Sequence, residues 1–492
     1  MKHYKSYLAV ITLCICGLCF SQDNVFLKRD FWDTKPSVEV IKQKILEGNI
    51  PSEANSNNFD GVVYAILQNA PLESIVYMIS LKGNDVNKLT HDGRTYIFWA
   101  AYKGNSALIE YLLENGAKTN LTDDKGNTIV TFAAGAGQKN PKVYDLIFDK
   151  DKDQISKTNP DGANALLLAA PTDEELKLVS YFQSKGLDIN SKDNSGNGIF
   201  NYVARTGNTP LMNTLLAKDI KGTDQAFLFT AFGSRGHINT LSAYEYLESV
   251  DLNPNVANDE GVTPLHVVAS INKDLEVLNY LLDKGLDVNS RDNDGNTAFI
   301  NAASRNDLSV LKTLILKVKD INVSNNKGET ALALAVKYNS AEVVEFLLSK
   351  KATTKLNDKD GNNIAYYLVS GFSLRDKEQF RKKAELLKGS GVNLTDVQRN
   401  GNTLYHMAVE KQSLELLEFA LANKADINAK NKEGNTALHI AAMKAKDAKI
   451  LEFLVAQGAD KKATTDFEES AFDLALENEL LKKNNISIDF LK

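Results

Sequence analysis

Cysteine is nearly absent from the sequence, and what there is lies at one end. The chain of 492 residues has 3 cysteines, and Cys14, Cys16 and Cys19 all fall within the first twenty positions. If this segment is removed, the remaining chain has no thiol. Disulfide bonds, thiol nucleophiles, cysteine-ligated zinc and iron–sulfur clusters are then excluded, and the core must stabilise the fold unaided.

Proline, long apolar runs and a strong excess of one charge are also lacking. The sequence has 9 prolines, 57 basic against 63 acidic residues, and a formal net charge of −6. After Phe20 no segment is apolar enough to cross a bilayer, which excludes a polytopic membrane protein. The hydrophobic fraction of 43% excludes disorder, and the mild acidity argues against nucleic-acid binding. The length fits roughly three ordinary domains or one long repeat array.

The first twenty-one residues have the pattern of a secretory signal peptide. Lys2 and Lys5 precede an uncharged apolar run, Leu8 to Phe20, that is short for a transmembrane helix. Cleavage is expected after Ser21, so that the mature chain is not inserted in the membrane. Lipid attachment at Cys19 is the alternative, but it requires a small residue where Leu18 stands. We therefore expect an exported protein, in the periplasm rather than the medium because no additional sorting domain follows the last repeat.

After residue 60 the sequence repeats with a period of about 33 residues. The recurring motif is an Asp, Lys, Glu or Asn followed by Gly-x-Thr, with degenerate copies, and its glycines stand at positions 61, 93, 126, 162, 196, 261, 295, 328, 361, 401 and 434. The gap between Gly196 and Gly261 hides one decayed unit. The longer gap between Gly361 and Gly401 indicates about seven extra residues near Ser370–Arg381. About thirteen units are expected.

Each unit predicts a pair of helices. The glycine provides the positive φ of a tight turn, and the threonine two residues later caps a short helix with small residues such as Ala302 and Ala303. A second helix follows, with apolar residues at helical spacing as in the run from Val343. It ends at a glycine such as Gly285. Such units bury their apolar faces only against their neighbours.

The repeat resembles that of ankyrin-repeat proteins over about nine tenths of the mature chain. The fullest match is Thr263, Pro264, Leu265 and His266, and close variants begin at Thr403 with His406 and at Thr436 with His439. The resemblance implies an all-α ankyrin-repeat solenoid of about thirteen helix-turn-helix units, with short β-hairpin connections and helical caps at both ends. It also implies that the three histidines bond their threonines and neighbouring backbone.

The expected domain boundaries follow from this reading. They are residues 1–21 for the signal peptide, 22–59 for an N-terminal capping segment, 60–466 for the repeats, with the decayed unit near 222–259, and 467–492 for a last degenerate repeat and C-terminal cap.

No motif for catalysis, a cofactor or a metal accompanies the repeats. The strings GxxxxGK[ST], GxSxG and HExxH do not occur, and His91 and His237 have no His or Cys at ligand spacing. An EF-hand frame centred on Gly295 places Ser290 and Asn301 where carboxylates are needed, which argues against calcium. We therefore predict a protein that is not an enzyme, has no cofactor and has no metal site.

The resemblance places partner contacts around the turn glycine and just after the small residues of the first helix. The predicted contacts are His91, Arg94, Tyr102, Lys103, Arg205, Arg305, Tyr338, Lys411 and Lys444. Trp99, between these groups, falls on a core position. We expect a monomer that binds another protein through its concave hairpin and first-helix face. The alternatives are a protective scaffold for a periplasmic enzyme and a small-ligand or metal receptor built on the irregular units near 195–240.

Overall fold

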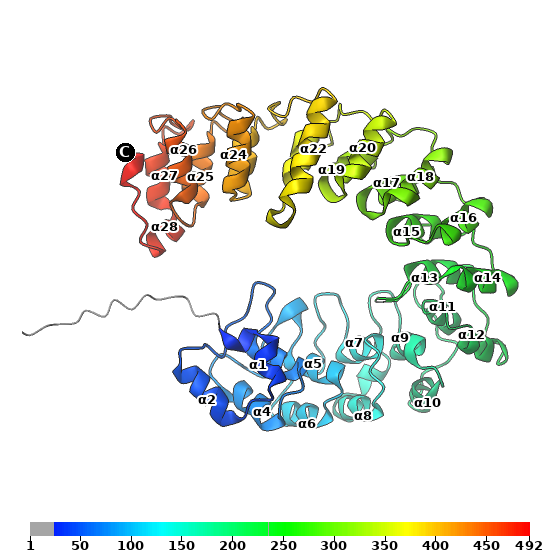
Figure 1. Ribbon diagram of the computed structural model, residues 1–492. Helices are drawn as coiled ribbons and strands as arrows, with labels where there is room; N and C mark the ends of the chain where they lie inside the picture. The colour runs from blue at the N-terminus through cyan, green and yellow to red at the C-terminus, as the bar shows by residue number, and fades with distance from the viewer. Residues whose placement is uncertain (1–23, 235) are drawn as a thin grey trace, which may run out of the picture. The chain divides into compact units, whose positions relative to one another are not determined.

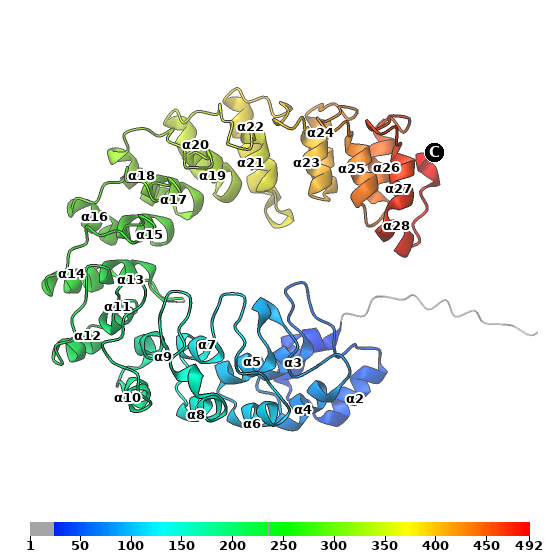
Figure 2. The same cartoon turned by 180° about the vertical axis from the view of Figure 1, so that it is seen from behind.

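The computed structural model describes residues 24–234 and 236–492. The predicted signal peptide lies outside the described residues. The chain divides into two compact units, which meet between Tyr202 and Val203. Each unit is a stack of short helices, shown from opposite sides in Figure 1 and Figure 2.

The repeats form thirteen helix pairs in the described part of the chain, as predicted. The first helix of each pair, in chain order, is α3 (Gly61–Leu67), α5 (Tyr96–Lys103), α7 (Ile129–Gly135), α9 (Ala165–Ala169), α11 (Ile199–Ala204), α13 (Ala226–Phe232), α15 (Pro264–Ile271), α17 (Ala298–Arg305), α19 (Ala331–Tyr338), α21 (Ile364–Ser370), α23 (Leu404–Glu410), α25 (Ala437–Lys444) and α27 (Ala471–Glu477). The second helices are α4 (Leu72–Ser80), α6 (Ser106–Glu114), α8 (Pro141–Lys150), α10 (Lys177–Ser184), α12 (Thr209–Leu216), α14 (Leu241–Ser249), α16 (Leu275–Asp283), α18 (Leu308–Leu314), α20 (Ala341–Ser349), α22 (Lys377–Gly389), α24 (Leu414–Ala422), α26 (Lys449–Ala456) and α28 (Glu479–Lys483).

Within each unit the helices form two layers. First helices pack on first helices, as in α15, α17 and α19, and second helices pack on second helices, as in α14, α16 and α18. Ala302 and Ala303 on a first helix and Leu311 on a second helix are fully buried between the layers. The small side chains of the first helices allow neighbouring pairs to approach closely, and the large side chains of the second helices fill the core.

The connections between repeats are turns rather than hairpins of strands. Among the described residues the chain has only isolated antiparallel bridges, such as the one between Ser324 and Thr330. The expected β-hairpins are therefore reduced to single bridges. The reason is a local hydrogen bond. The Oδ1 atom of an Asp or Asn accepts a hydrogen bond from the backbone N–H four residues later, as Asp292 does from Asn296 at 2.8 Å. This bond closes a tight turn before a strand can extend.

Many successive turns are joined by one backbone hydrogen bond. The N–H of Asn326 donates to the carbonyl of Asp294 at 2.7 Å, and the N–H of Lys359 donates to that of Lys327 at 2.9 Å. Gly328 lies at such a junction with φ of 82°, and a Cβ there would stand 2.9 Å from the Cα of Asp358. The position needs glycine both for its conformation and for the closeness of the next turn.

Short helices precede the first pair and follow the last one. The 3-10 helix η1 (Val25–Leu27) and helices α1 (Arg29–Asp33) and α2 (Val38–Leu46) pack against α3 and α4, and the buried Trp32 donates from Nε1 to the Phe26 carbonyl at 2.8 Å. At the other end η7 (Asp489–Leu491) packs against α27.

Two repeats exceed the period of about 33 by several residues, with glycine spacings of 36 between Gly126 and Gly162 and 40 between Gly361 and Gly401. In one, the 3-10 helix η3 (Lys152–Ile155) follows α8. In the other, a connection containing η6 (Leu374–Asp376) precedes α22, which at 13 residues is the longest helix in the described part of the chain. Three further 3-10 turns are η2 (His91–Gly93), η4 (Ala170–Thr172) and η5 (Ile315–Lys317). None of the helices in residues 24–234 and 236–492 has the length and apolar character to span a membrane.

Candidate functional site

The predicted contact residue Arg94 is buried, which corrects the expectation that it faces a partner. Its Nε and Nη2 atoms donate to Oδ2 of Asp123 at 3.0 and 2.8 Å, and Nη1 lies 3.1 Å from Oδ2 of Asp92. The guanidinium also stands 4.1 Å from the ring centroid of Phe132 and 5.3 Å from that of Trp99. Only 7% of Arg94 is exposed, so its hydrogen-bonding groups are used within the protein.

The other predicted residues of the first unit surround this ion pair. Trp99 is buried, in agreement with its core position in the repeat. Half-buried His91 stacks on Phe59 with ring centroids 4.2 Å apart, and Tyr102 meets Trp99 edge-on at 6.5 Å. Lys103, half-buried, is the last residue of α5. These rings form a packed aromatic cluster with little free surface.

The predicted residues of the second unit lie at or just after the ends of first helices. Arg305 and Tyr338 are exposed last residues of α17 and α19, and Lys411 follows α23. Exposed Lys444 ends α25 and pairs with Glu410 at 2.7 Å. Arg205 is half-buried, 5.2 Å above the ring of Phe229. The structure thus places the Lys444 ammonium at Glu410, the residue before Lys411, and gives Arg305 no contact with either lysine among the described residues.

The three signature histidines connect neighbouring repeats. In each, Nδ1 accepts from the backbone N–H of the capping threonine, Thr263, Thr403 or Thr436, at 3.0–3.2 Å. Nε2 then carries the proton and donates to a carbonyl of the following turn, as His406 does to Asn435 and His439 to Ala463, both at 2.9 Å. Burial lowers the pKa of His266, His406 and His439, which keeps the rings neutral. Pro264 begins α15, and Leu265 is fully buried.

A second connection between repeats uses buried asparagines. The C-cap residue of α17, Asn306, donates from Nδ2 to the carbonyls of Ala269 and Asn272 at 2.9 and 2.8 Å. Asn339, the C-cap of α19, donates in the same way to Ala303 and Asn306. We call this series, Asn239, Asn272, Asn306, Asn339 and Asn478, the asparagine ladder.

The asparagine ladder is interrupted where the extra residues lie. The C-cap of α21 is Gly371, which has no side chain, and a Cβ there would collide with the carbonyl oxygen of Lys337. The carbonyl of Val336, the counterpart of that of Ala303, is instead bonded by Nζ of Lys383 from α22 at 2.9 Å. In this repeat a lysine side chain makes the hydrogen bond that an asparagine amide makes in the two preceding repeats.

A groove opens on the first-helix side of this irregular repeat. We call it the first-helix groove; it has a volume of about 450 Å³ and lies between α19, α21 and α23. Its floor contains Tyr366, Val369 and Met407, and its rim carries Lys337, Glu410 and Lys411. Lys411 donates from Nζ to the Ser370 carbonyl at 3.0 Å. An aromatic ring and a methionine within a polar rim are typical of protein-binding surfaces.

A smaller cavity of about 100 Å³ lies beside the groove, where the ladder is interrupted. We call it the ladder cavity, and its lining includes Asn339, Ser373, Asp376, Gln379 and Lys383. Lys337 lines both hollows. The predicted contact residue Tyr338 also borders the ladder cavity and is 59% exposed.

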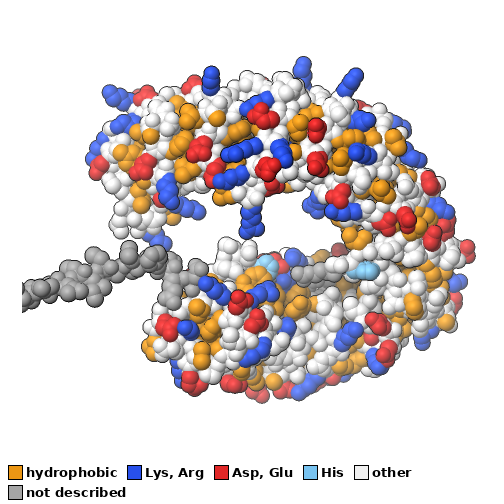
Figure 3. Space-filling model, in the orientation of Figure 1, with side chains coloured by type: hydrophobic (Ala, Val, Ile, Leu, Met, Phe, Trp, Pro, Cys, Tyr) orange, Lys and Arg blue, Asp and Glu red, His pale blue; other side chains and the backbone are white. Residues whose placement is uncertain are grey.

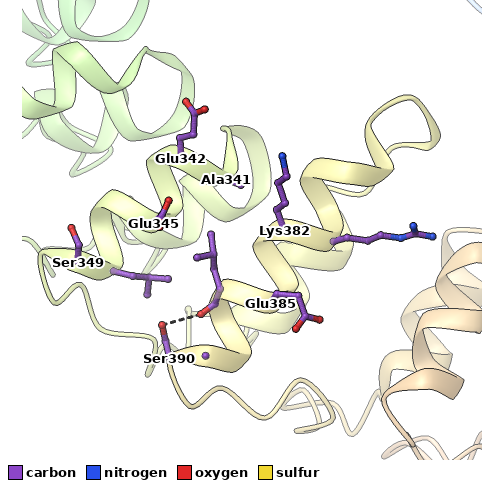
Figure 4. A pocket seen from close by; sticks show the side chains of 11 residues that line it. Ala341, Glu342, Glu345, Ser349, Lys382, Glu385 and Ser390 are labelled. Atoms are coloured by element: carbon purple, nitrogen blue, oxygen red, sulfur yellow. Dashed lines mark hydrogen bonds between the residues drawn. The ribbon is translucent and has the colours of Figure 1, made fainter.

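The second-helix side of the same repeat carries an open cleft of about 910 Å³ between α20 and α22. Figure 4 shows residues that line it, with Glu342 and Glu345 on α20 and Lys382 and Glu385 on α22. Figure 3 shows basic and acidic side chains interspersed over the visible surface. Among the described residues, no three His, Cys, Asp or Glu side chains gather closely enough to hold a metal ion.

Comparisons with known proteins agree with the repeat pattern. Models described as ankyrin repeats match residues 62–155, 299–373 and 378–465, and a second such model matches 267–315, together more than half of the chain. The chain is 30% identical over 148 residues to the phosphocholine transferase AnkX of Legionella pneumophila, which covers 30% of this chain and 16% of that protein. It is 30% identical over 215 residues to the nuclear factor NF-kappa-B p105 subunit of Gallus gallus, covering 40% of this chain and 22% of that protein.

The chain thus spans less than a quarter of the length of these two curated relatives. Among solved structures it is similar to the human ASB11 ankyrin repeat domain, with a TM-score of 0.38 and 23% identity. That alignment covers 45% of this chain and 96% of the solved one.

The predicted contacts Lys411 and Tyr338 line these hollows, and so do Tyr366, Met407 and Lys383, which the sequence analysis did not name. The long gap between Gly361 and Gly401 was the signal available for this repeat. A spacing of 33 or 34 residues among Asn239, Asn272, Asn306 and Asn339 would also have indicated the asparagine ladder.

Proposed function

Because this chain belongs to the ankyrin-repeat family, we propose that it is an exported protein that binds a partner protein through its turns and first helices and performs no catalysis of its own. The observation that carries the proposal is the first-helix groove. Its apolar floor is Tyr366, Val369 and Met407, and its rim is charged. Such a surface supplies a desolvated centre with a polar border, the arrangement that gives most binding energy in protein interfaces.

The floor of the groove is tightly packed. Val369 and Met407 are 3% and 6% exposed, which fixes the floor, whereas Lys411 and Glu410 on the rim reach solvent. A rigid floor limits the side-chain entropy lost on association. The exposed rim charges would set the orientation of the partner and the rate of encounter.

Capture of the partner from an exported-protein extract tests the groove. We expect the full chain to retain a stoichiometric partner, and the variant carrying Tyr366→Ala and Lys411→Ala to lose at least about nine tenths of it, since truncating a hot-spot pair costs roughly 2 kcal/mol or more. Retention is measured by quantitative mass spectrometry of the eluted proteins.

The matched control removes a tyrosine and a lysine from the second-helix layer, with Tyr246→Ala and Lys284→Ala. These residues lie on α14 and just after α16, away from the first-helix groove. Equal loss of the partner from both variants would contradict a groove-specific interaction. An enzyme among the retained proteins that loses activity in the absence of this chain would identify the complex as a protective scaffold.

Export is proposed from Lys2, Lys5 and the apolar run that ends at Phe20. In a bacterial host we expect the periplasmic fraction to contain a chain that begins at Gln22, as measured by intact mass. Leu13→Arg should leave the full-length chain in the cytoplasm, because a charge interrupts the apolar segment. A diacylglycerol-modified Cys19 at the N-terminus, or full-length wild-type chain in the cytoplasm, would overturn this part of the proposal.

A further inference from the structure

The ladder cavity lies beside a first helix whose C-cap has no ladder side chain, in the repeat that contains the extra residues. In the preceding repeats an asparagine at the C-cap fills this space and bonds two carbonyls of the previous repeat. At Gly371 that side chain is absent, and the connection through η6 leads away to α22. Lys383 reaches back from α22, but its single amine bonds one carbonyl and leaves a space of about 100 Å³ beside it.

The Lys383 ammonium is buried without a charged partner in contact. Only 6% of the residue is exposed, and within residues 24–234 and 236–492 its Nζ makes one hydrogen bond, to Val336, and no ion pair. An ammonium has three donors, and a buried cation is costly unless it is paired. Burial accordingly lowers the pKa of Lys383, while the Asp376 carboxylate acts in the opposite direction.

Gln379 adds a neutral donor to the cavity wall. The Oε1 atom of Gln379 accepts from the Ala341 N–H at 2.6 Å, so the amide nitrogen of Gln379 is the end left to donate. Ser373 and Asp376 are exposed, so the cavity reaches the surface at this side. The negative charge of Asp376 at this opening disfavours a doubly charged anion such as phosphate. A volume equal to roughly three waters suits a planar, singly charged group.

We propose that the ladder cavity binds a carboxylate, with Lys383 as its cationic partner and Gln379 as a neutral donor. The carboxylate comes either from a small organic acid or from a glutamate or aspartate side chain that a protein presents to this surface. Because Lys337 lines both this cavity and the first-helix groove, a side chain bound here would lie at the edge of that groove. The site stands on its own residues and does not depend on the proposed partner interaction.

The test measures carboxylate binding to the full chain with three probes: sodium acetate, sodium formate and glutamate blocked as N-acetyl and N-methylamide. Saturation-transfer NMR on the probe protons is recorded at constant ionic strength, with sodium chloride as the competing salt. We expect saturable binding in the millimolar range, because so small a ligand offers few contacts. Binding of the blocked glutamate supports a protein side chain as the source, and binding of acetate and formate alone supports a small acid.

Three variants make the proposal falsifiable. Lys383→Gln keeps an amide donor for Val336 but removes the charge, and we expect acetate to bind about tenfold more weakly. Asp376→Asn removes the opposing charge at the opening and should tighten binding severalfold. Lys382→Gln removes a neighbouring exposed charge that pairs with Glu378 and should change nothing. Absence of saturable binding by the wild type, or unchanged binding by Lys383→Gln, would overturn the proposal.

Discussion

Replacing Asp123 by alanine is expected to lower the free energy of unfolding by about 3–5 kcal/mol, because it breaks a buried ion pair and removes the hydrogen bonds of a turn. The side chain of Asp123 is fully buried and accepts from Nε and Nη2 of Arg94. Its other oxygen takes the backbone N–H groups of Lys125 and Asn127 at 3.0 and 2.8 Å. The substitution therefore removes the turn bonds together with one of the two carboxylates that contact Arg94, while Oδ2 of Asp92 stays 3.1 Å from Nη1. Urea unfolding followed by tryptophan fluorescence reports on it directly, because Trp99 stands 5.3 Å from the guanidinium.

Two comparisons separate the ion pair from the turn. Asp292 holds the equivalent turn through Asn296 but makes no ion pair with a described residue, so Asp292→Ala should cost only the turn bonds, about 1–2 kcal/mol. Adding Arg94→Met to Asp123→Ala should recover part of the loss, since an apolar pair of similar volume tolerates burial. If Asp123→Ala and Asp292→Ala destabilise equally, the ion pair contributes nothing.

Much of the fold could be predicted from the sequence, because most repeats contain the residues that determine their own turn and helices. The turn glycine, the capping threonine and the apolar spacing of the second helix recur at nearly constant intervals, and they define thirteen helix pairs. Burial of Leu265 and Leu347 follows from helical periodicity alone. The turns were less predictable: an Asp or Asn that closes a tight turn looks in sequence like the tip of a hairpin, but no strand extends from it in the described residues.

The candidate site was predicted less well, because its residues gain their roles from contacts between repeats. Arg94 looks exposed in a single repeat, yet Asp123 of the next repeat and Phe132 beyond it enclose its guanidinium. Lys383 looks like one charge in a basic stretch, yet it is buried and bonds the Val336 carbonyl of the preceding repeat. Local patterns fix which helix a residue lies on, but such contacts depend on how the irregular connection folds.

The asparagine ladder provides the second large expected effect. Asn306 is 2% exposed, and its amide nitrogen serves two carbonyls of the preceding repeat while its oxygen accepts the Asp307 N–H at 2.8 Å. Asn306→Ala removes these bonds and leaves buried carbonyls without partners, each at a cost of about 1–3 kcal/mol. We expect a loss of about 2–4 kcal/mol in the free energy of unfolding. Denaturant titration followed by circular dichroism measures it.

Asn272→Ala is the matched control, because Asn272 is equally buried but its amide nitrogen makes one long hydrogen bond, of 3.4 Å, to the Asn239 carbonyl. We expect Asn272→Ala to lower the free energy of unfolding by less than Asn306→Ala. This result would show that the contribution of a ladder asparagine depends on how many carbonyls its amide nitrogen bonds, and not on the burial of its side chain. The same reasoning explains why the chain tolerates Gly371: Lys383 serves the Val336 carbonyl there in place of an amide. Equal losses for Asn306→Ala and Asn272→Ala would contradict the two-carbonyl account and, with it, the reading of Lys383 as a substitute for a ladder residue.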